Sequence, residues 1–222
     1  MLDPQAQALM KLMLDKGVPP VNTMTAVEAR ESYRSRRAFT QPDAPEVFKT
    51  EDQVASYFDV NVPVRVYRPF SSQSQKSLPA LVYIHGGGWT IGDLDTHDVL
   101  CRSLCLQADI VVISVDYRMG PEHKFPAAYN DTVAAFIWTA TNAVSLGIDP
   151  SRIAIGGDSA GGNLSAAPVL DCAIKLAQLC NRLFNCSSTL PPSCGQTPPP
   201  SMPMAKATCS PKSQSRITPT TI

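Results

Sequence analysis

The amino-acid sequence lacks the features that mark several large classes of protein. It contains no run of about 18 apolar residues, so we expect no membrane span. Its 19 Lys and Arg residues equal its 19 Asp and Glu residues in number, which excludes the basic surface typical of nucleic-acid-binding proteins. Asp3 lies where a secretory signal would have basic residues, and no apolar segment follows it. These absences predict a soluble, cytoplasmic protein.

Metal ligands are also scarce. The chain has only 3 His, and its 7 Cys form neither a Cys-x-x-Cys pair nor a cluster with histidine. An odd number of cysteines without a secretory signal indicates free thiols rather than a disulfide framework. We therefore predict no metal site.

The composition changes after Leu170. Residues 171–222 contain five of the 7 Cys, many Ser, Thr and Pro residues, and no His. Such a segment cannot bury enough apolar surface to offset the entropy lost on ordering, so we expect disorder beyond about Leu183. The predicted units are helices in 1–45, a globular core in 46–170, and the end of a helix followed by a tail in 171–222.

Hydrophobic periodicity predicts the elements before this change. Amphipathic helices are expected at 4–16 and 25–37, and the second begins with Thr25 and Glu28 at the spacing of a capping box. The segments that follow are extended at 47–60 and 62–67, apolar at 80–84, 110–115 and 152–156, and helical at 97–107, 126–144 and 160–179. Wholly apolar strands between helices are typical of a mostly parallel sheet covered on both faces, so the predicted fold class is α/β.

The segment 157–161 has the pattern Gly-x-Ser-x-Gly, directly after an apolar run and at the start of a helix. In this context the turn is so tight that side chains at Gly157 and Gly161 would collide with neighbouring backbone. The hydroxyl of Ser159 is then expected at the edge of the sheet, above a helix N-terminus that favours negative charge. A glycine turn that only starts a helix is the alternative interpretation.

A second glycine motif argues against that alternative. His85 and three consecutive glycines follow the apolar run 80–84, and Trp89 comes next. Glycines at the end of a strand allow backbone N–H groups to point into a cleft, as an oxyanion hole requires. Open α/β sheets place their sites at the carboxyl ends of strands, which is where both motifs lie.

Five segments together resemble the hormone-sensitive-lipase-like carboxylesterases of the α/β-hydrolase fold. They are HGGGW at 85–89, GDLDTH at 92–97, DYRMGPEH at 116–123, FPAA at 125–128 and GDSAGGN at 157–163. The resemblance covers about residues 1–167. It implies N-terminal cap helices in 1–45, a partial α/β-hydrolase core in 46–170, and a tail unrelated to the family.

The resemblance also implies an activity and a set of site residues. It implies hydrolysis of small carboxylic esters, usually with short acyl chains, without a cofactor. Ser159 would be the nucleophile, and the backbone N–H groups of Gly87, Gly88 and Ala160 would form the oxyanion hole. Trp89 and the N-terminal helices would help to line the substrate pocket.

The rest of a catalytic triad is not found. In this fold the acid and the histidine follow the serine in the chain, but only Asp171 and no histidine follow Ser159. Asp171 would lie roughly 18 Å from Ser159 along a helix. The family's later strands, with the acid and histidine, are expected to be missing through truncation or a frameshift, which would leave the strand near Ile153 as an exposed edge prone to self-association.

No residue before Ser159 replaces the missing base. His85 is expected to brace the glycine loop, and His97 to cap or anchor the helix that follows it. His123 would lie in a turn, and Asp158 would pack and form hydrogen bonds. Four charged residues are expected to form ion pairs that hold the loops: Asp116, Arg118, Glu122 and Asp131.

The sequence therefore predicts an ester hydrolase by family with severely impaired activity. Two alternatives remain. One is a non-catalytic ligand-binding protein on the same scaffold, as in the gibberellin receptors, which resemble this family and lack the catalytic histidine. The other is a sequence artefact without a stable product.

Overall fold

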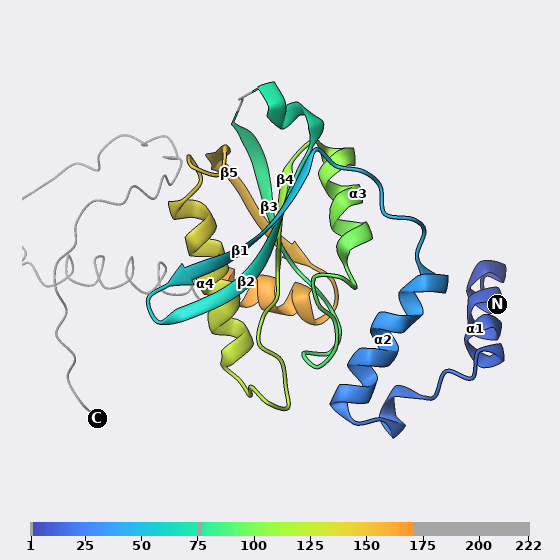
Figure 1. The fold of residues 1–222 in the computed structure, drawn as a ribbon. Helices are drawn as coiled ribbons and strands as arrows, with labels where there is room; N and C mark the ends of the chain where they lie inside the picture. The colour runs from blue at the N-terminus through green and yellow to red at the C-terminus, as the bar shows by residue number, and fades with distance from the viewer. Residues whose placement is uncertain (1, 75–76, 171–222) are drawn as a thin grey trace, which may run out of the picture. The chain divides into compact units, whose positions relative to one another are not determined.

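A five-stranded sheet organises the part of the chain that this computed structural model describes, residues 2–74 and 77–170 (Figure 1). The strand order is β1-β2-β4-β3-β5. The strands are β1 (Lys49–Tyr57), β2 (Val60–Arg68), β3 (Leu78–Ile84), β4 (Val111–Val115) and β5 (Ile148–Gly157). The predicted tail in 171–222, including Asp171, lies outside the described residues.

The fold is α/β as predicted, but its sheet is mixed, with both parallel and antiparallel strand pairs. β3 pairs in parallel with both β4 and β5, which agrees with the prediction from the apolar runs. β1 and β2 form an antiparallel hairpin, and β2 also runs antiparallel to β4. The hairpin follows from its short connection at Phe58 and Asp59, because a two-residue turn joins only antiparallel strands.

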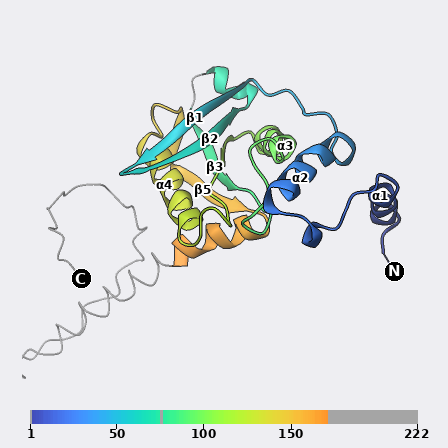
Figure 2. The ribbon, with the colours of Figure 1, turned by 60° about the horizontal axis from the view of Figure 1, so that its bottom comes forward.

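Two helices cover opposite faces of the sheet. Successive side chains of a strand point to opposite sides, so apolar strands place apolar side chains on both faces, and each face needs a cover. α4 (Ala127–Thr141) packs on the face that carries Val111 and Ile113. α3 (Asp98–Ala108) packs on the other face, where Cys101 and Cys105 contact Tyr67, Tyr83 and Val112. The helix that starts at Ala160 lies on the α4 side, where Leu164 joins the core (Figure 2).

Two helices precede the sheet, as predicted. α1 (Pro4–Asp15) begins where the Asp3 carboxylate accepts a hydrogen bond from Gln5 N, 2.8 Å away. α2 (Ala26–Thr40) begins with the predicted capping box of Thr25 and Glu28. None of the helices in the described ranges is long and apolar enough to cross a membrane.

β5 forms one edge of the sheet. Among residues 2–74 and 77–170 it pairs with β3 alone, and β1 forms the opposite edge. Ile153 and Ile155 are partly buried against the core, while Ala154 between them is exposed. An apolar strand with one unpaired edge offers backbone N–H and C=O groups to another strand.

A matched pair of valine substitutions tests the position of the core. Val82 is fully buried at the centre of β3, whereas Val144 is 85% exposed after α4. We expect Val82→Ala to lower the free energy of unfolding by about 2 kcal/mol, because it removes two buried methyl groups and leaves a cavity. Val144→Ala should change it by less than about 0.5 kcal/mol in the same urea titration. Equal effects would contradict this core assignment.

Candidate active site

Ser159 lies at a sharp turn between β5 and the helix that starts at Ala160. Its φ of 51° is in the left-handed region, which a serine adopts only at a strained or specialised position. The turn is closed by a hydrogen bond of 2.8 Å from Gly161 N to the carbonyl oxygen of Asp158. The side chain of Ser159 is exposed, so its hydroxyl is accessible to a ligand.

The turn lies directly against the end of β3. A Cβ atom at Gly157 or Gly161 would overlap the carbonyl oxygen of Ile84, and one at Gly161 would also lie 2.7 Å from the carbonyl oxygen of His85. Both neighbours are backbone atoms, which cannot move aside as a flexible side chain can. The predicted steric need for glycine at these two positions is therefore confirmed.

The glycine loop after β3 has an irregular backbone. Gly87, Gly88 and Trp89 have φ values of 124°, 60° and 58°. The carbonyl oxygen of Gly87 accepts hydrogen bonds from Thr90 N and Ile91 N at 3.1 and 3.0 Å, which fold the loop into a tight turn. Trp89 is 45% exposed beside this turn.

Backbone N–H groups at both motifs are free to donate. Within residues 2–74 and 77–170, those of Gly87, Gly88 and Ala160 donate to no protein acceptor. Ala160 is the first residue of its helix, where backbone N–H groups have no partner inside the helix. Free donors at a helix N-terminus and an adjacent glycine loop are suited to binding a negatively charged oxygen.

Asp158 joins the two motifs. Its Oδ1 accepts a hydrogen bond of 2.9 Å from Gly86 N and one of 2.7 Å from the Tyr83 hydroxyl. The prediction that Asp158 serves hydrogen bonding is confirmed, and its carboxylate connects the end of β3 to the turn after β5. The sequence did not predict a role for Tyr83 in this site, because its position in an apolar run indicates only core packing.

His85 is completely buried under the glycine loop. Its Nδ1 lies 2.8 Å from the carbonyl oxygen of Gly86, and its ring stacks on Tyr117 with 4.4 Å between centroids. The Tyr117 hydroxyl donates to the carbonyl oxygen of His85 at 2.8 Å. Burial lowers the pKa of His85 to about 4, so the ring is neutral at pH 7. These contacts suit a residue that braces the loop.

His97 anchors the structure but does not cap α3. It occupies the N-cap position without a side-chain hydrogen bond to the helix, so of the two predicted roles, cap or anchor, the structure favours the anchor. Its ring turns inward instead, where it stacks on His85 at 5.3 Å and places Nε2 3.5 Å from Asp158 Oδ1. Burial lowers the pKa of His97 as well.

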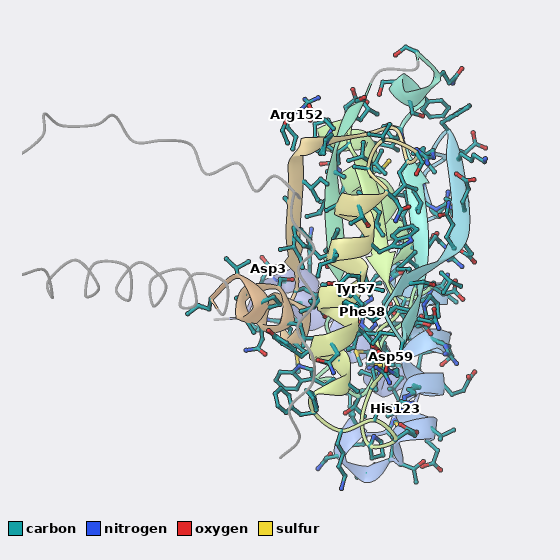
Figure 3. All side chains as sticks on the ribbon, turned by 90° about the vertical axis from the view of Figure 1, so that its left-hand side faces the viewer. Asp3, Tyr57, Phe58, Asp59, His123 and Arg152 are labelled. Atoms are coloured by element: carbon teal, nitrogen blue, oxygen red, sulfur yellow. The ribbon has the colours of Figure 1, made fainter. Side chains whose placement is uncertain are left out.

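His123 is exposed on the loop before α4 (Figure 3). Its backbone N–H donates to the carbonyl oxygen of Met119 at 3.0 Å, as expected for a turn. In the described part of the chain, neither it nor another histidine forms a hydrogen bond with Ser159. No group of three or more His, Cys, Asp or Glu side chains there has the arrangement of a metal site.

Three of the four predicted loop ion-pair residues have a partner. Arg118 pairs with Asp131 at 2.7 Å, and Glu122 pairs with Arg30 of α2, also at 2.7 Å. The prediction is wrong for Asp116, which has no ion pair within the described residues. The cations near it pair with other carboxylates, Arg34 with Asp93 and Arg65 with Asp52 and Asp95. Burial raises the pKa of the Asp116 carboxyl to about 6.

α2 makes contacts with the loops that were not predicted from the sequence. Arg30 donates hydrogen bonds to two loop carbonyl oxygens, and Arg34 pairs with Asp93. The sequence did contain a signal for these contacts. Arg30 and Arg34 are four residues apart, so they lie on the same face of a helix and form a basic stripe. Nothing in the sequence identified the acceptors.

Two pockets that share Arg118 and His123 lie beside the loops. Trp89 lines one of about 400 Å³, together with Phe125, Tyr129, Leu164 and Ala167. The N-terminal helices do not line this pocket. α2 contributes its two arginines, Arg30 and Arg34, to a second and more charged pocket of about 430 Å³.

Comparisons with known proteins find the same architecture. A family described as having the alpha/beta hydrolase fold matches residues 81–207. The carboxylesterase NlhH of Mycobacterium tuberculosis is 44% identical over 166 residues, which are 73% of this chain and 50% of NlhH. The ethyl acetate hydrolase of Pseudomonas putida is 39% identical over 149 residues, 67% of this chain and 47% of that protein. The chain therefore spans about half the length of these curated relatives.

Solved structures of ester hydrolases superpose on the described fold. One from the metagenome of Lake Arreo, complexed with a bipyridine phosphonate derivative, has a TM-score of 0.73 and 37% identity, covering 79% of this chain and 56% of the other. The hyperthermophilic esterase of Pyrobaculum calidifontis has a TM-score of 0.71 and 36% identity, covering 78% and 55%.

Replacing a glycine of the Ser159 turn tests the close contact with β3. We expect Gly161→Ala to lower the free energy of unfolding by roughly 2–4 kcal/mol, because its methyl group would overlap two backbone carbonyl oxygens. Gly17→Ala is the control, since Gly17 has a φ of +64° and open space around it. That change should cost only about 1 kcal/mol. A Gly161→Ala protein as stable as the control variant in denaturant titration would show that the turn does not lie against β3.

Proposed function

The chain belongs to the hormone-sensitive-lipase-like carboxylesterases of the α/β-hydrolase fold, and from this membership we propose that its two glycine motifs form an ester-hydrolysing site. The observation that carries the proposal is the position of Ser159. Its exposed side chain lies on a left-handed turn, next to the free N–H group of Ala160, and the preceding Asp158 is hydrogen-bonded to the glycine loop at Gly86.

In the proposed reaction the Ser159 hydroxyl oxygen attacks the carbonyl carbon of a small ester. The carbonyl oxygen becomes negatively charged and accepts hydrogen bonds from the N–H groups of Gly87, Gly88 and Ala160. His85 and Trp89 support the loop that presents two of these donors. The carbonyl group re-forms as the alcohol leaves, and the hydroxyl proton of Ser159 passes through solvent water to that alcohol. Water then attacks the acyl carbon, which releases the carboxylic acid and returns a proton to the Ser159 oxygen. No cofactor takes part in these steps.

A general base for Ser159 is not among the chain's 3 histidines. His85 and His97 are buried beneath the loop. His123 lines the same pocket as Trp89 but forms no hydrogen bond with Ser159 among the described residues, and no histidine follows Ser159 in the sequence. A serine hydroxyl is a weak nucleophile without a base to accept its proton. Loss of the base costs about a million-fold in turnover, and oxyanion stabilisation with binding leaves roughly a thousand-fold acceleration over water. We therefore propose that these 222 residues alone hydrolyse esters very slowly.

Hydrolysis of p-nitrophenyl acetate by the 222-residue chain tests this proposal. We expect turnover below about 10⁻³ s⁻¹ because median enzyme turnover is near 10 s⁻¹ and the base is missing. The same assay on Ser159→Ala should show a further loss to the buffer rate. Turnover near 1 s⁻¹ that disappears in Ser159→Ala would mean that a base exists within the chain. Identical rates for both proteins and buffer would favour a non-catalytic ligand-binding role.

β5 has an edge that pairs with no strand among residues 2–74 and 77–170, and this edge supports a second expectation, self-association. At micromolar concentration we expect the chain to elute from size-exclusion chromatography ahead of a 23.9 kDa monomer. Ala154→Lys should shift the protein toward the monomer, because a charge on an edge strand opposes strand pairing. Val144→Lys adds the same charge away from the sheet and should not. A monomeric unmodified chain would contradict the expectation.

A further inference from the structure

Arg30 of α2 connects two loops that are far apart in sequence. Its Nε donates to the carbonyl oxygen of Thr90 at 2.7 Å, and its Nη2 donates to that of Gly120, also at 2.7 Å. Thr90 belongs to the glycine turn, residues 86–91, which contains the proposed oxyanion donors Gly87 and Gly88. Gly120 belongs to the loop after β4. The guanidinium therefore links α2 to both loops at once.

The two loops also bond directly to each other. Gly120 N donates to the carbonyl oxygen of Trp89 at 2.8 Å, next to the carbonyl that Arg30 binds. The glycine turn has its own closure, in which Thr90 N and Ile91 N donate to the carbonyl oxygen of Gly87. Arg30 thus binds the C-terminal part of the turn at Thr90, while Asp158 binds its first residue through Gly86 N.

Arg30 also forms an ion pair with Glu122, and the strength of this pair is to be compared with that of the bonds to the two carbonyl oxygens. Nη1 and Nη2 donate to the two carboxylate oxygens at 2.9 and 2.7 Å. The Glu122 side chain is 46% exposed, however, and exposed ion pairs contribute little to stability. The Arg30 side chain is only 19% exposed, and its bonds to the carbonyl oxygens are charge-assisted and partly buried. The carbonyl contacts are therefore the stronger constraint.

We propose that Arg30 is a positioning residue that fixes the backbone of the glycine turn, residues 86–91, in the conformation that presents the Gly87 and Gly88 N–H groups. Its role in reaction rests on the proposed function, since it touches neither Ser159 nor the expected substrate. The effect on the loop does not depend on catalysis and is measured separately.

Amide hydrogen exchange tests the effect on the loop. The amides of Gly86, Thr90 and Ile91 are hydrogen-bonded in the turn, so their exchange reports its opening. We expect Arg30→Met to speed their exchange at least tenfold, with amides of β3 and β4 changed less than threefold. Hydrogen bonds to charged groups are strong enough for a change of this size.

Two control variants separate this role from a general effect of charge. Arg36→Met removes an arginine of the same helix that donates within α2 to Ser32 and stacks on Tyr33, and it should change exchange in 86–91 less than threefold. Glu122→Gln removes the ion pair and leaves the two carbonyl bonds, and it should do the same. A change of less than threefold in Arg30→Met, an equal increase in either control, or an increase spread over β3 and β4 would overturn the proposal.

Arg30→Lys covers the case in which Arg30→Met does not fold, as judged by circular dichroism. A lysine keeps the charge but cannot reach both carbonyl oxygens with a planar fork. We expect its exchange in 86–91 to lie between those of the unmodified and methionine proteins, or to increase at least threefold if the methionine protein is unfolded. An unchanged rate would overturn the proposal.

Single-turnover acylation of Ser159 by p-nitrophenyl acetate, followed by intact-protein mass, tests the effect on reaction. We expect Arg30→Met to slow the limiting acylation rate about tenfold with an unchanged half-saturating concentration, and Arg36→Met to leave both unchanged. If the unmodified chain shows no acylation dependent on Ser159, the proposed function fails and exchange alone decides the role of Arg30. If acylation occurs and Arg30→Met leaves its rate unchanged, the positioning role is wrong.

Discussion

The contact between the Ser159 turn and the end of β3 is the constraint on which the rest of the site depends. Gly157 and Gly161 bring the turn so close to the carbonyl oxygen of Ile84 that no side chain fits between them. This approach is possible because β3 and β5 are adjacent and parallel, so their carboxyl ends meet at the same edge of the sheet. The nucleophile candidate and the glycine loop are neighbours for that reason.

A layer of buried, neutral polar rings supports the loop from below. His85 stacks between Tyr117 and His97, and Tyr83 lies beside His97 at 6.2 Å. Burial lowers the pKa of the histidines and raises that of the tyrosines, so all four rings are uncharged near pH 7. A buried charge would need a partner, whereas neutral rings pack closely and hold the loop by hydrogen bonds to its backbone.

An ester-hydrolysing site needs two kinds of group. Oxyanion donors depend only on local backbone geometry, whereas a general base is a side chain from a distant segment. The proposed oxyanion donors are backbone N–H groups of residues within the two glycine motifs, so the same local turns that shape the loops also present them. A general base is a side chain that must approach Ser159 from another element of the fold. Under the proposed function the described residues supply the first kind of group, and Arg30 of α2 is proposed to support it.

The sequence by itself determined most of the elements and both glycine motifs, because periodicity and turn sterics are local properties. It predicted the capping box at Thr25, the parallel strands around β3 and the need for glycine at 157 and 161. Only the tertiary structure decided that Arg30 reaches two loop carbonyls, that His97 stacks inward instead of capping α3, and that Asp116 has no ion pair. The physical reason is that these contacts join segments from different parts of the chain, and charge or ring type does not specify a partner until the fold places the acceptors.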